Sequence, residues 1–254
     1  MNKINVVDNK IIPFDNTDVI LNNNITTFTN NGDYYLEYIT SDNVNITINI
    51  EDNVCVQLFE YSNNNDINTN ITYNLGKNSS LIISKFYYND NTNEEINIYL
   101  NKKNANIKYN FSSISKNHDN YLINIYHNDS TTNSDIFNRT IAKENSSNNF
   151  DINSYVENKI LDCYLNQSTK IITLGDSNNK INPNMFTHDN SVTAIHASVI
   201  GNVNEEELFY LMSRGISYNE AIKIIIKGII LSNINPNMEY REKILNILEE
   251  VGGE

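Results

Sequence analysis

Few side chains in this sequence can bind a metal or transfer a proton near neutral pH, since it has four histidines and two cysteines among 254 residues. His196 stands out because it lies in a stretch, AIHASVIGNVNEEELFYLMSRGIS at residues 194–217, that differs from the asparagine-rich chain around it. A neutral imidazole can bind a transition metal, and its charge changes close to physiological pH. The alternative is a histidine hydrogen-bonded to the backbone at a strand end. His196 is therefore a candidate ligand whose role depends on its surroundings.

The two cysteines, Cys55 and Cys163, lie in separate segments of the chain. Their spacing is not that of a metal finger, and two cysteines are too few for a disulfide scaffold. We expect both to be reduced thiols that pack as small apolar side chains.

The remaining motifs argue against an enzyme. The sequence has no glycine-rich phosphate loop, no Ser-His-Asp arrangement in a nucleophile elbow and no pair of carboxylates in an otherwise apolar setting. The other histidines, His118, His127 and His188, stand beside Asn or Asp in contexts typical of exposed turns. We expect no catalysis by this chain, and if ATP is used, another chain binds it.

Charge and composition restrict the class of protein. The formal charge is −13 and no basic stripe is present, which excludes nucleic acid as a partner because phosphate binding depends on Lys and Arg. The first ten residues lack an apolar targeting segment, and the longest aliphatic run, IKIIIKGIIL, is too short to span a membrane. We therefore expect a cytoplasmic protein without a membrane anchor.

The elements that must position His196 are short strands. From about residue 40 to 200 apolar and polar residues alternate, as in NVNITINI at residues 43–50, which is typical of strands with one buried face. Asn and Asp fill the turns, and they tolerate left-handed backbone conformations. Strands recur at regular spacing without hairpin dipeptides, so a solenoid is favoured over a sandwich.

After residue 203 the apolar period changes to that of helices. Asn204 is expected to cap a helix that ends at Gly215, and Ser217 with Glu220 forms a capping box for a second helix. Pro236 is expected at the first position of a third helix. The predicted organisation is a β-helix core over residues 1–202, with its first 40 or so residues unassigned, and a helical module over residues 203–254.

The stretch HASVIGNVNEEELFYLMSRGIS resembles the C-terminal signature of the SufB/SufD family, the scaffold proteins of the SUF iron–sulfur cluster assembly system. The family pattern is a His, small residues, an acidic triplet, Leu-Phe-Tyr and Arg-Gly-Ile. The resemblance continues upstream through residues 138–186 and implies a right-handed parallel β-helix. It also implies pairing of two β-helices through their C-terminal strands and docking of a SufC-type ATPase on the C-terminal helices, here through Glu207, Leu208, Phe209, Tyr210, Arg214 and Gly215.

The resemblance also bears on cluster chemistry. SufB members have a cysteine where this chain has Thr169, and a His-Glu pair where it has His196 and Ala197. A Thr hydroxyl neither binds iron as a thiolate does nor accepts sulfur. The chain is thus more similar to SufD, with His196 as a candidate cluster ligand and Cys163 as a second. No tightly bound cofactor is expected, only a transient iron–sulfur cluster at the interface with a SufB-like chain or a second copy of this chain.

A carbohydrate-binding or carbohydrate-active β-helix is the competing interpretation, since parallel solenoids also serve as polysaccharide lyases and surface proteins. Such proteins are normally exported and line a groove with carboxylates and aromatic rings. This sequence has no export signal and no Trp.

Overall fold

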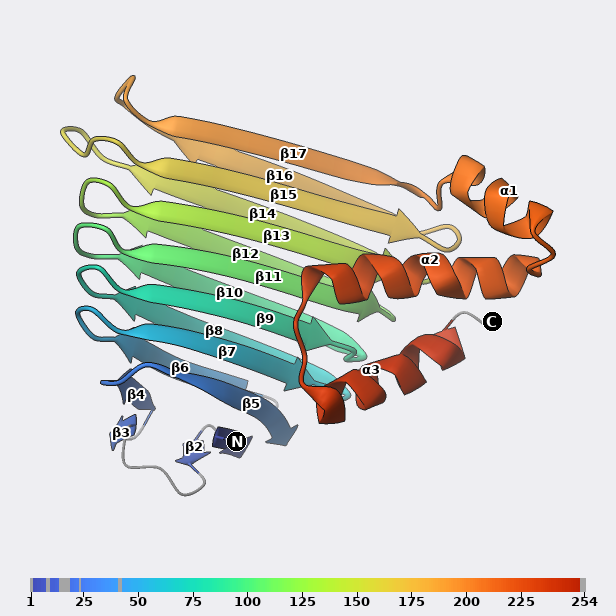
Figure 1. The fold of residues 1–254 in the computed structure, drawn as a ribbon, viewed down its shortest axis with the longest axis horizontal. Helices are drawn as coiled ribbons and strands as arrows, with labels where there is room; N and C mark the ends of the chain where they lie inside the picture. Colours follow the sequence, from blue (N-terminus) through green and yellow to red (C-terminus); the bar gives the residue numbers. More distant parts are fainter. Residues whose placement is uncertain (1, 8–9, 14–18, 23, 41–42, 252–254) are drawn as a thin grey trace.

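The computed structural model describes residues 2–7, 10–13, 19–22, 24–40 and 43–251. Two sheets face each other and are connected strand by strand, so that the chain winds through successive coils before it enters three helices (Figure 1). The predicted mainly β solenoid with a C-terminal helical segment is confirmed.

Sheet A contains nine strands and sheet B eight. Sheet A consists of β1 (Asn2–Val7), β2 (Lys10–Pro13), β5 (Gly32–Thr40), β7 (Cys55–Ser62), β9 (Ser80–Tyr87), β11 (Asn106–Ser115), β13 (Asn133–Ala142), β15 (Tyr164–Thr173) and β17 (Thr193–Asn202). Sheet B consists of β3 (Val19–Asn22), β4 (Ile25–Phe28), β6 (Asn43–Ile50), β8 (Asp66–Leu75), β10 (Asn91–Leu100), β12 (His118–His127), β14 (Ser147–Val156) and β16 (Asn178–Phe186). From β4 and β5 onward, each strand pairs in parallel with the strand one coil later.

Two antiparallel hairpins lie at the N-terminal end of the solenoid. β1 pairs with β2, and β3 pairs with β4. An uncovered strand edge promotes aggregation, and very short edge strands, here β2 and β3 with four residues each, limit that risk. These hairpins occupy the part of the chain to which the sequence assigned no structure.

The alternating apolar residues point into the space between the sheets. Val44, Ile46, Ile48 and Ile50 on β6 are at most 2% exposed. Their partners one coil later, Thr69, Ile71, Tyr73 and Leu75 on β8, are buried to the same extent. Parallel, in-register stacking therefore makes continuous columns of buried side chains, which is why the period of two extends over so much of the sequence.

Asparagine side chains form ladders on the outside of the coils. Nδ2 of Asn153 donates to Oδ1 of Asn124 at 3.0 Å, and Nδ2 of Asn124 donates to Oδ1 of Asn97 at 3.1 Å. At the corners, Asn53, Asn78 and Asn104 adopt left-handed backbone conformations, which Asn tolerates better than most residues. About a fifth of the chain is Asn, and both roles of this residue are structural.

The three helices are α1 (Glu205–Ser213), α2 (Tyr218–Asn233) and α3 (Met238–Val251). Asn204 accepts hydrogen bonds from the backbone of Glu206 and Glu207, and Ser217 forms the predicted capping box with Glu220. The start of α3 differs from the prediction. Asn237 caps it through its side chain, so Pro236 precedes the cap rather than occupying the first helical position.

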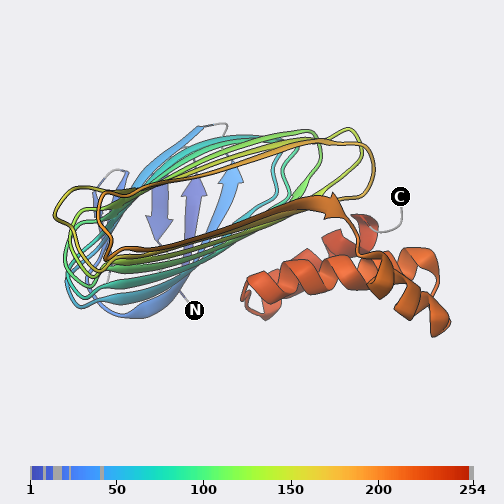
Figure 2. The same cartoon turned by 90° about the horizontal axis from the view of Figure 1, so that it is seen from above.

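α2 and α3 cover the outer face of sheet A where its strands end (Figure 2). Aromatic side chains of the sheet meet Tyr240 of α3, whose ring lies 5.2 Å from that of Phe59 and 5.3 Å from that of Tyr61. Lys243 of α3 adds an ion pair of 3.0 Å with Glu37 of β5. The helices thus share a buried cluster with the solenoid, whereas α1 contributes no buried residue.

Candidate functional site

The C-terminal end of the solenoid is formed by β16 and β17, the last strands of the two sheets. Their outer edges have no partner strand among the described residues (Figure 1). Apolar side chains are exposed here, with Ile195 at 48%, Val199 at 52% and Phe186 at 48%. We call these two strands the open end. Unpaired backbone groups beside exposed apolar side chains are suited to adding another strand.

His196 lies on β17 and pairs with Gln167 of β15. Gln167 is 1% exposed and faces the interior, and parallel partners point to the same side of a sheet. His196 therefore belongs to the inward face of the last coil. It is nevertheless exposed, because no coil follows to cover it. The structure thus places the candidate ligand at the open end.

The positions that differ from SufB lie close to His196. Thr169 pairs with Ser198 of β17, is 2% exposed and accepts a hydrogen bond of 3.0 Å from Asn138 Nδ2. Ala197 lies between His196 and Ser198 and points outward. Thr169 therefore has a packed, hydrogen-bonded position that explains its presence without cluster chemistry.

Cys163 lies in a different part of the coil. It is 2% exposed, with its Sγ 3.3 Å from Thr132 Oγ1, so the expectation of a packed thiol is confirmed at this position. Cys163 precedes Gln167 by four residues, which at the rise of a strand is about 13 Å along the sheet. The fold therefore does not bring Cys163 and His196 together within one chain.

No group of three or more His, Cys, Asp or Glu side chains within the described segments is arranged to hold a metal ion. A cluster bound at His196 would accordingly need ligands from outside this chain.

The candidate docking residues form the surface of α1. Phe209 is 75% exposed and Tyr210 58%, while Leu208 is partly buried against the helical cluster. The guanidinium of Arg214 lies 5.4 Å from the Tyr210 ring, within cation–π range. Gly215 has φ of +87° and supplies the predicted left-handed stop. With the exposed Glu207, these residues make an apolar surface with acidic and basic charges at its margins.

A groove of about 580 Å³ runs between α1 and α2. Its lining is mainly apolar and includes Tyr210, Leu211, Ile224 and Ile229, with Glu206 and Glu207 at its margin. Ile224 is 47% exposed although it lies on the long helix α2. A groove of this size and character fits a helix or a large apolar side chain of a partner.

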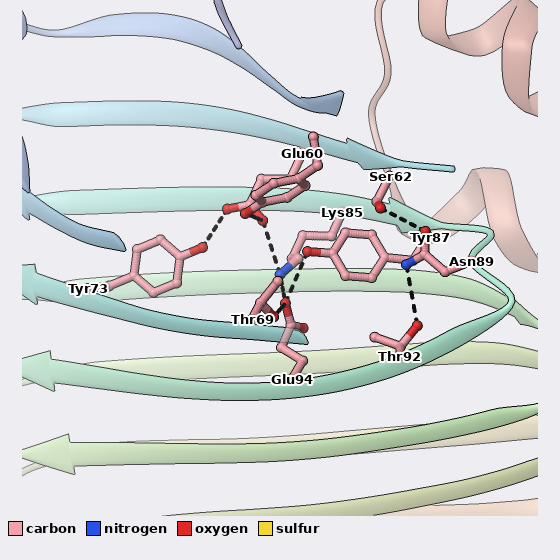
Figure 3. A network of polar contacts seen from close by, with 10 residues as sticks. Glu60, Ser62, Thr69, Tyr73, Lys85, Tyr87, Asn89, Thr92 and Glu94 are labelled. Carbon is pink, nitrogen blue, oxygen red and sulfur yellow. Dashed lines mark hydrogen bonds and ion pairs between the residues drawn. The ribbon is translucent and has the colours of Figure 1, made fainter. Parts of the chain in front are cut away.

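The largest feature that the sequence analysis missed is a buried ionic network (Figure 3). Lys85 Nζ lies 3.0 Å from Glu60 Oε2 and 2.7 Å from Glu94 Oε1, and all three side chains are at most 1% exposed. Burial alone would lower the pKa of Lys85, but the charge of Glu60 and the hydrogen bonds with Glu60 and Glu94 raise it above its usual value. The expectation that no carboxylates are paired in an apolar setting is therefore wrong.

Two further expectations are also wrong. Cys55 is exposed, not packed. His127 is 1% exposed rather than in a solvated turn, and its ring nitrogens lie 2.8 Å from Thr132 Oγ1 and 3.0 Å from Ser134 Oγ. His127 ends β12 and points inward, as do the apolar residues two and four positions before it. The alternation of inward and outward residues along the strand could therefore have predicted its burial.

Comparison with known proteins shows the family to which the chain belongs. The family model described as "SUF system FeS cluster assembly, SufBD core domain" matches residues 22–229. The match covers most of the chain, and the chain belongs to the SufB/SufD family.

Individual relatives match over shorter stretches. The iron–sulfur cluster assembly protein SufD of Bacillus subtilis is 25% identical over 134 residues, which are 52% of this chain and 31% of that protein. The SufBD family protein PH1385 of Pyrococcus horikoshii is 54% identical over 35 residues, covering 14% of this chain and 8% of that protein. The SufBD family protein ycf24 of Galdieria sulphuraria is 44% identical over 46 residues, covering 18% and 21%. The chain thus spans about a third or less of each relative's length.

Within the described residues, no helix combines the length and apolar character that crossing a bilayer requires.

Proposed function

We propose that this chain is a non-enzymatic scaffold subunit of a SUF iron–sulfur cluster assembly complex. Family membership supports the general role. The observation that carries the specific role is the juxtaposition of His196 with an uncovered pair of strand edges at the open end.

The open end is proposed to pair with the corresponding end of a second β-helix. That second chain is either a cysteine-bearing SufB-like protein or another copy of this chain. A partner strand along β17 would satisfy its unpaired backbone groups and cover Ile195 and Val199. His196 would then lie at the interface, beside ligands that the partner supplies.

The α1 surface and the groove between α1 and α2 are proposed to dock a SufC-type ATPase. Phe209 and Tyr210 are the aromatic anchors, since exposed aromatic and Arg side chains dominate the binding energy of many interfaces. Because α1 follows β17 after two residues, movement of a bound ATPase can be passed to the open end.

The role of His196 is proposed to be that of a cluster ligand or proton carrier. Thr169 and Ala197 replace the SufB cysteine and glutamate, so the chain is proposed to act as the SufD-like half of the complex. It would not assemble a thiolate-ligated cluster without a partner.

The experiment is reconstitution from purified components. The chain is mixed with a SufC-type ATPase, with and without a SufB-like chain, separated by size and analysed for iron and sulfide. We expect a stable complex in both cases, and cluster formation only with the cysteine-bearing partner. If the chain fails to bind the ATPase both with and without the SufB-like chain, the proposal is overturned.

A further inference from the structure

The buried network contains one more negative than positive charge when both carboxyls are ionised. Glu60 and Glu94 share the single cation Lys85, which is fully buried. No other Lys, Arg or His in the described part of the chain forms an ion pair with either carboxylate. An uncompensated charge in a dry core is very unfavourable, so the excess must be balanced where it lies.

The side chains around the network cannot balance it. Tyr38 of β5, Tyr73 of β8, Tyr87 of β9, Tyr109 of β11 and Tyr121 of β12 face the carboxyls, and burial raises the pKa of each phenol well above its usual value. They are neutral donors. Asp119 of β12 also faces this part of the core, where hydrogen bonds with Ser115 and Thr92 and the charge of Lys116 favour its ionised form, and it adds no positive charge to the network.

The two carboxyls differ in their hydrogen bonds (Figure 3). Both oxygens of Glu60 accept, Oε1 from the Tyr73 hydroxyl and Oε2 from Lys85 and, at 3.3 Å, from Tyr38. Glu94 uses one oxygen only. Its Oε1 accepts from Lys85 at 2.7 Å and from Thr69 and Tyr87 at 3.0 Å, whereas its Oε2 is buried without a partner.

We propose that Glu94 is a carboxylic acid in the folded protein, with its proton on Oε2. The network of Glu60, Lys85 and Glu94 then contains a neutral acid, an ammonium and a carboxylate, and its charges cancel. The proton comes from solvent as the chain folds. The Tyr109 phenol oxygen also lacks a partner and lies close enough to Glu94 for the charge of that carboxyl to act on it, so it is the available acceptor. A single water can bridge any remaining gap.

The first test is infrared spectroscopy of the folded chain at about pH 7.5. Asp119, whose pKa burial raises to about 6, is mainly ionised there. We expect a carbonyl stretch of a protonated carboxyl that disappears in Glu94→Gln. Absence of that band in the parent chain would overturn the proposal. If that band is absent and the unfolding temperature rises with the concentration of sodium or potassium, a bound cation balances the charge in place of the proton.

Glu60→Gln is the matched variant that locates the proton. A glutamine at position 94 can place its amide NH₂ where the proton is proposed, so Glu94→Gln should unfold at the same temperature as the parent or higher. A glutamine at position 60 removes the ionised carboxylate that the proposal pairs with the buried Lys85, so Glu60→Gln should unfold at a clearly lower temperature. The reverse order would place the proton on Glu60 and refute the assignment to Glu94.

A second measurement uses proton linkage between about pH 6.5 and 8. Folding takes up one proton if Glu94 is protonated in the folded chain and ionised in the unfolded chain. The unfolding equilibrium constant of the parent should then rise about tenfold per pH unit relative to that of Glu94→Gln. Parallel pH profiles for the two proteins would contradict the proposal.

Discussion

His196 and Gln167 occupy paired positions on the last two strands of sheet A. Gln167 is buried, whereas His196 is exposed because its strand is the last of the solenoid and no further coil covers it. Gln167 is fixed by its Nε2, which donates to Ser154 Oγ at 2.8 Å and to the backbone oxygen of Asn184 at 3.3 Å. The last coil therefore presents His196 on a rigid, hydrogen-bonded base. Rigid support of this kind is what a ligand at an interface requires.

Replacing His196 with Ala should leave folding and partner binding intact but slow cluster formation in the reconstituted complex by roughly tenfold or more. The reason is loss of an imidazole at the interface, without loss of packing, because His196 is exposed. Ser198→Ala, on the same inward face of β17, is the matched control. Thr169→Ala should also have little effect on cluster yield. Parental rate and yield in His196→Ala would show that the residue only ends a strand.

Changing Tyr210 and Arg214 together to Ala should weaken binding of the ATPase by about 2 kcal/mol, or roughly 30-fold. Both side chains are exposed on the α1 surface and contact each other, so their removal should not unfold the solenoid. Arg241→Ala, an exposed change on α3, serves as the control. Calorimetric titration with the ATPase gives the affinity, and an unchanged value for the double variant would exclude this surface.

Substitution of Val199 by Lys should abolish pairing of β-helices at the open end. Val199 is 52% exposed on β17, and a lysine there would be desolvated by a partner strand. Light scattering should show a dimer for the parent chain, alone or with the SufB-like partner, and separate chains for the variant. Ile20→Lys, at an equally exposed apolar residue of the N-terminal end, should leave the mass unchanged. A parent chain that stays monomeric with every candidate partner would rule out the interface.

Asp119 and His127 are buried groups with opposite pKa shifts, and their contributions to the pH dependence of the free energy of unfolding should nearly cancel between about pH 4 and 6. Burial raises the pKa of Asp119 to about 6, so its contribution is present at low pH and is lost as the pH rises through 6. Burial lowers the pKa of His127 to about 4, so its contribution is present above 6.5 and is lost as the pH falls toward 4. Each amounts to about 3 kcal/mol.

Asp119→Asn should remove one of these contributions and expose the other. Relative to that of the parent, its free energy of unfolding should fall by up to about 3 kcal/mol as the pH decreases from 6.5 to 4, because the opposing contribution of Asp119 is then absent. Urea unfolding at several pH values measures the difference. The exposed Asp176→Asn should behave like the parent, and a profile for Asp119→Asn that runs parallel to that of the parent would disprove the opposing pair.

Local features were predictable from the sequence, whereas contacts between coils were not. The caps at Asn204 and Ser217 depend on residues three positions apart, and both were predicted correctly. The ionic network joins Glu60, Lys85 and Glu94, which lie on three different strands. The alternation of the sequence does place each of them on the inward side, since each lies two residues from a buried apolar residue of its own strand, Leu58, Ile83 or Ile96. Only the register of the coils, however, shows that they meet.

The same limit applies to the candidate site. His196 could be selected from its motif, and its inward orientation follows from pairing with Gln167. The separation of Cys163 from His196 along the sheet, by contrast, depends on where the turn before β15 ends, because Cys163 immediately precedes that strand. Turn lengths vary here, so the distance between the two side chains could not be derived from their spacing in the sequence.

The asparagine ladders record how the coils change in length along the solenoid. Laddered partners are 25 residues apart at Asn68 and Asn43, then 27 at Asn124 and Asn97, 29 at Asn153 and Asn124, and 31 at Asn184 and Asn153. The step from 25 to 27 accompanies a change in sheet A from eight residues in β9 to ten in β11. From 27 to 31 the strands of both sheets, β11 to β15, keep ten residues each, so the further added length lies in the corners. An odd insertion within a strand would turn its inward side chains outward, whereas a corner can take up extra residues at little cost. Related chains can therefore gain or lose corner residues while the register of their strands is kept. Equivalent positions in distant relatives should accordingly be aligned coil by coil.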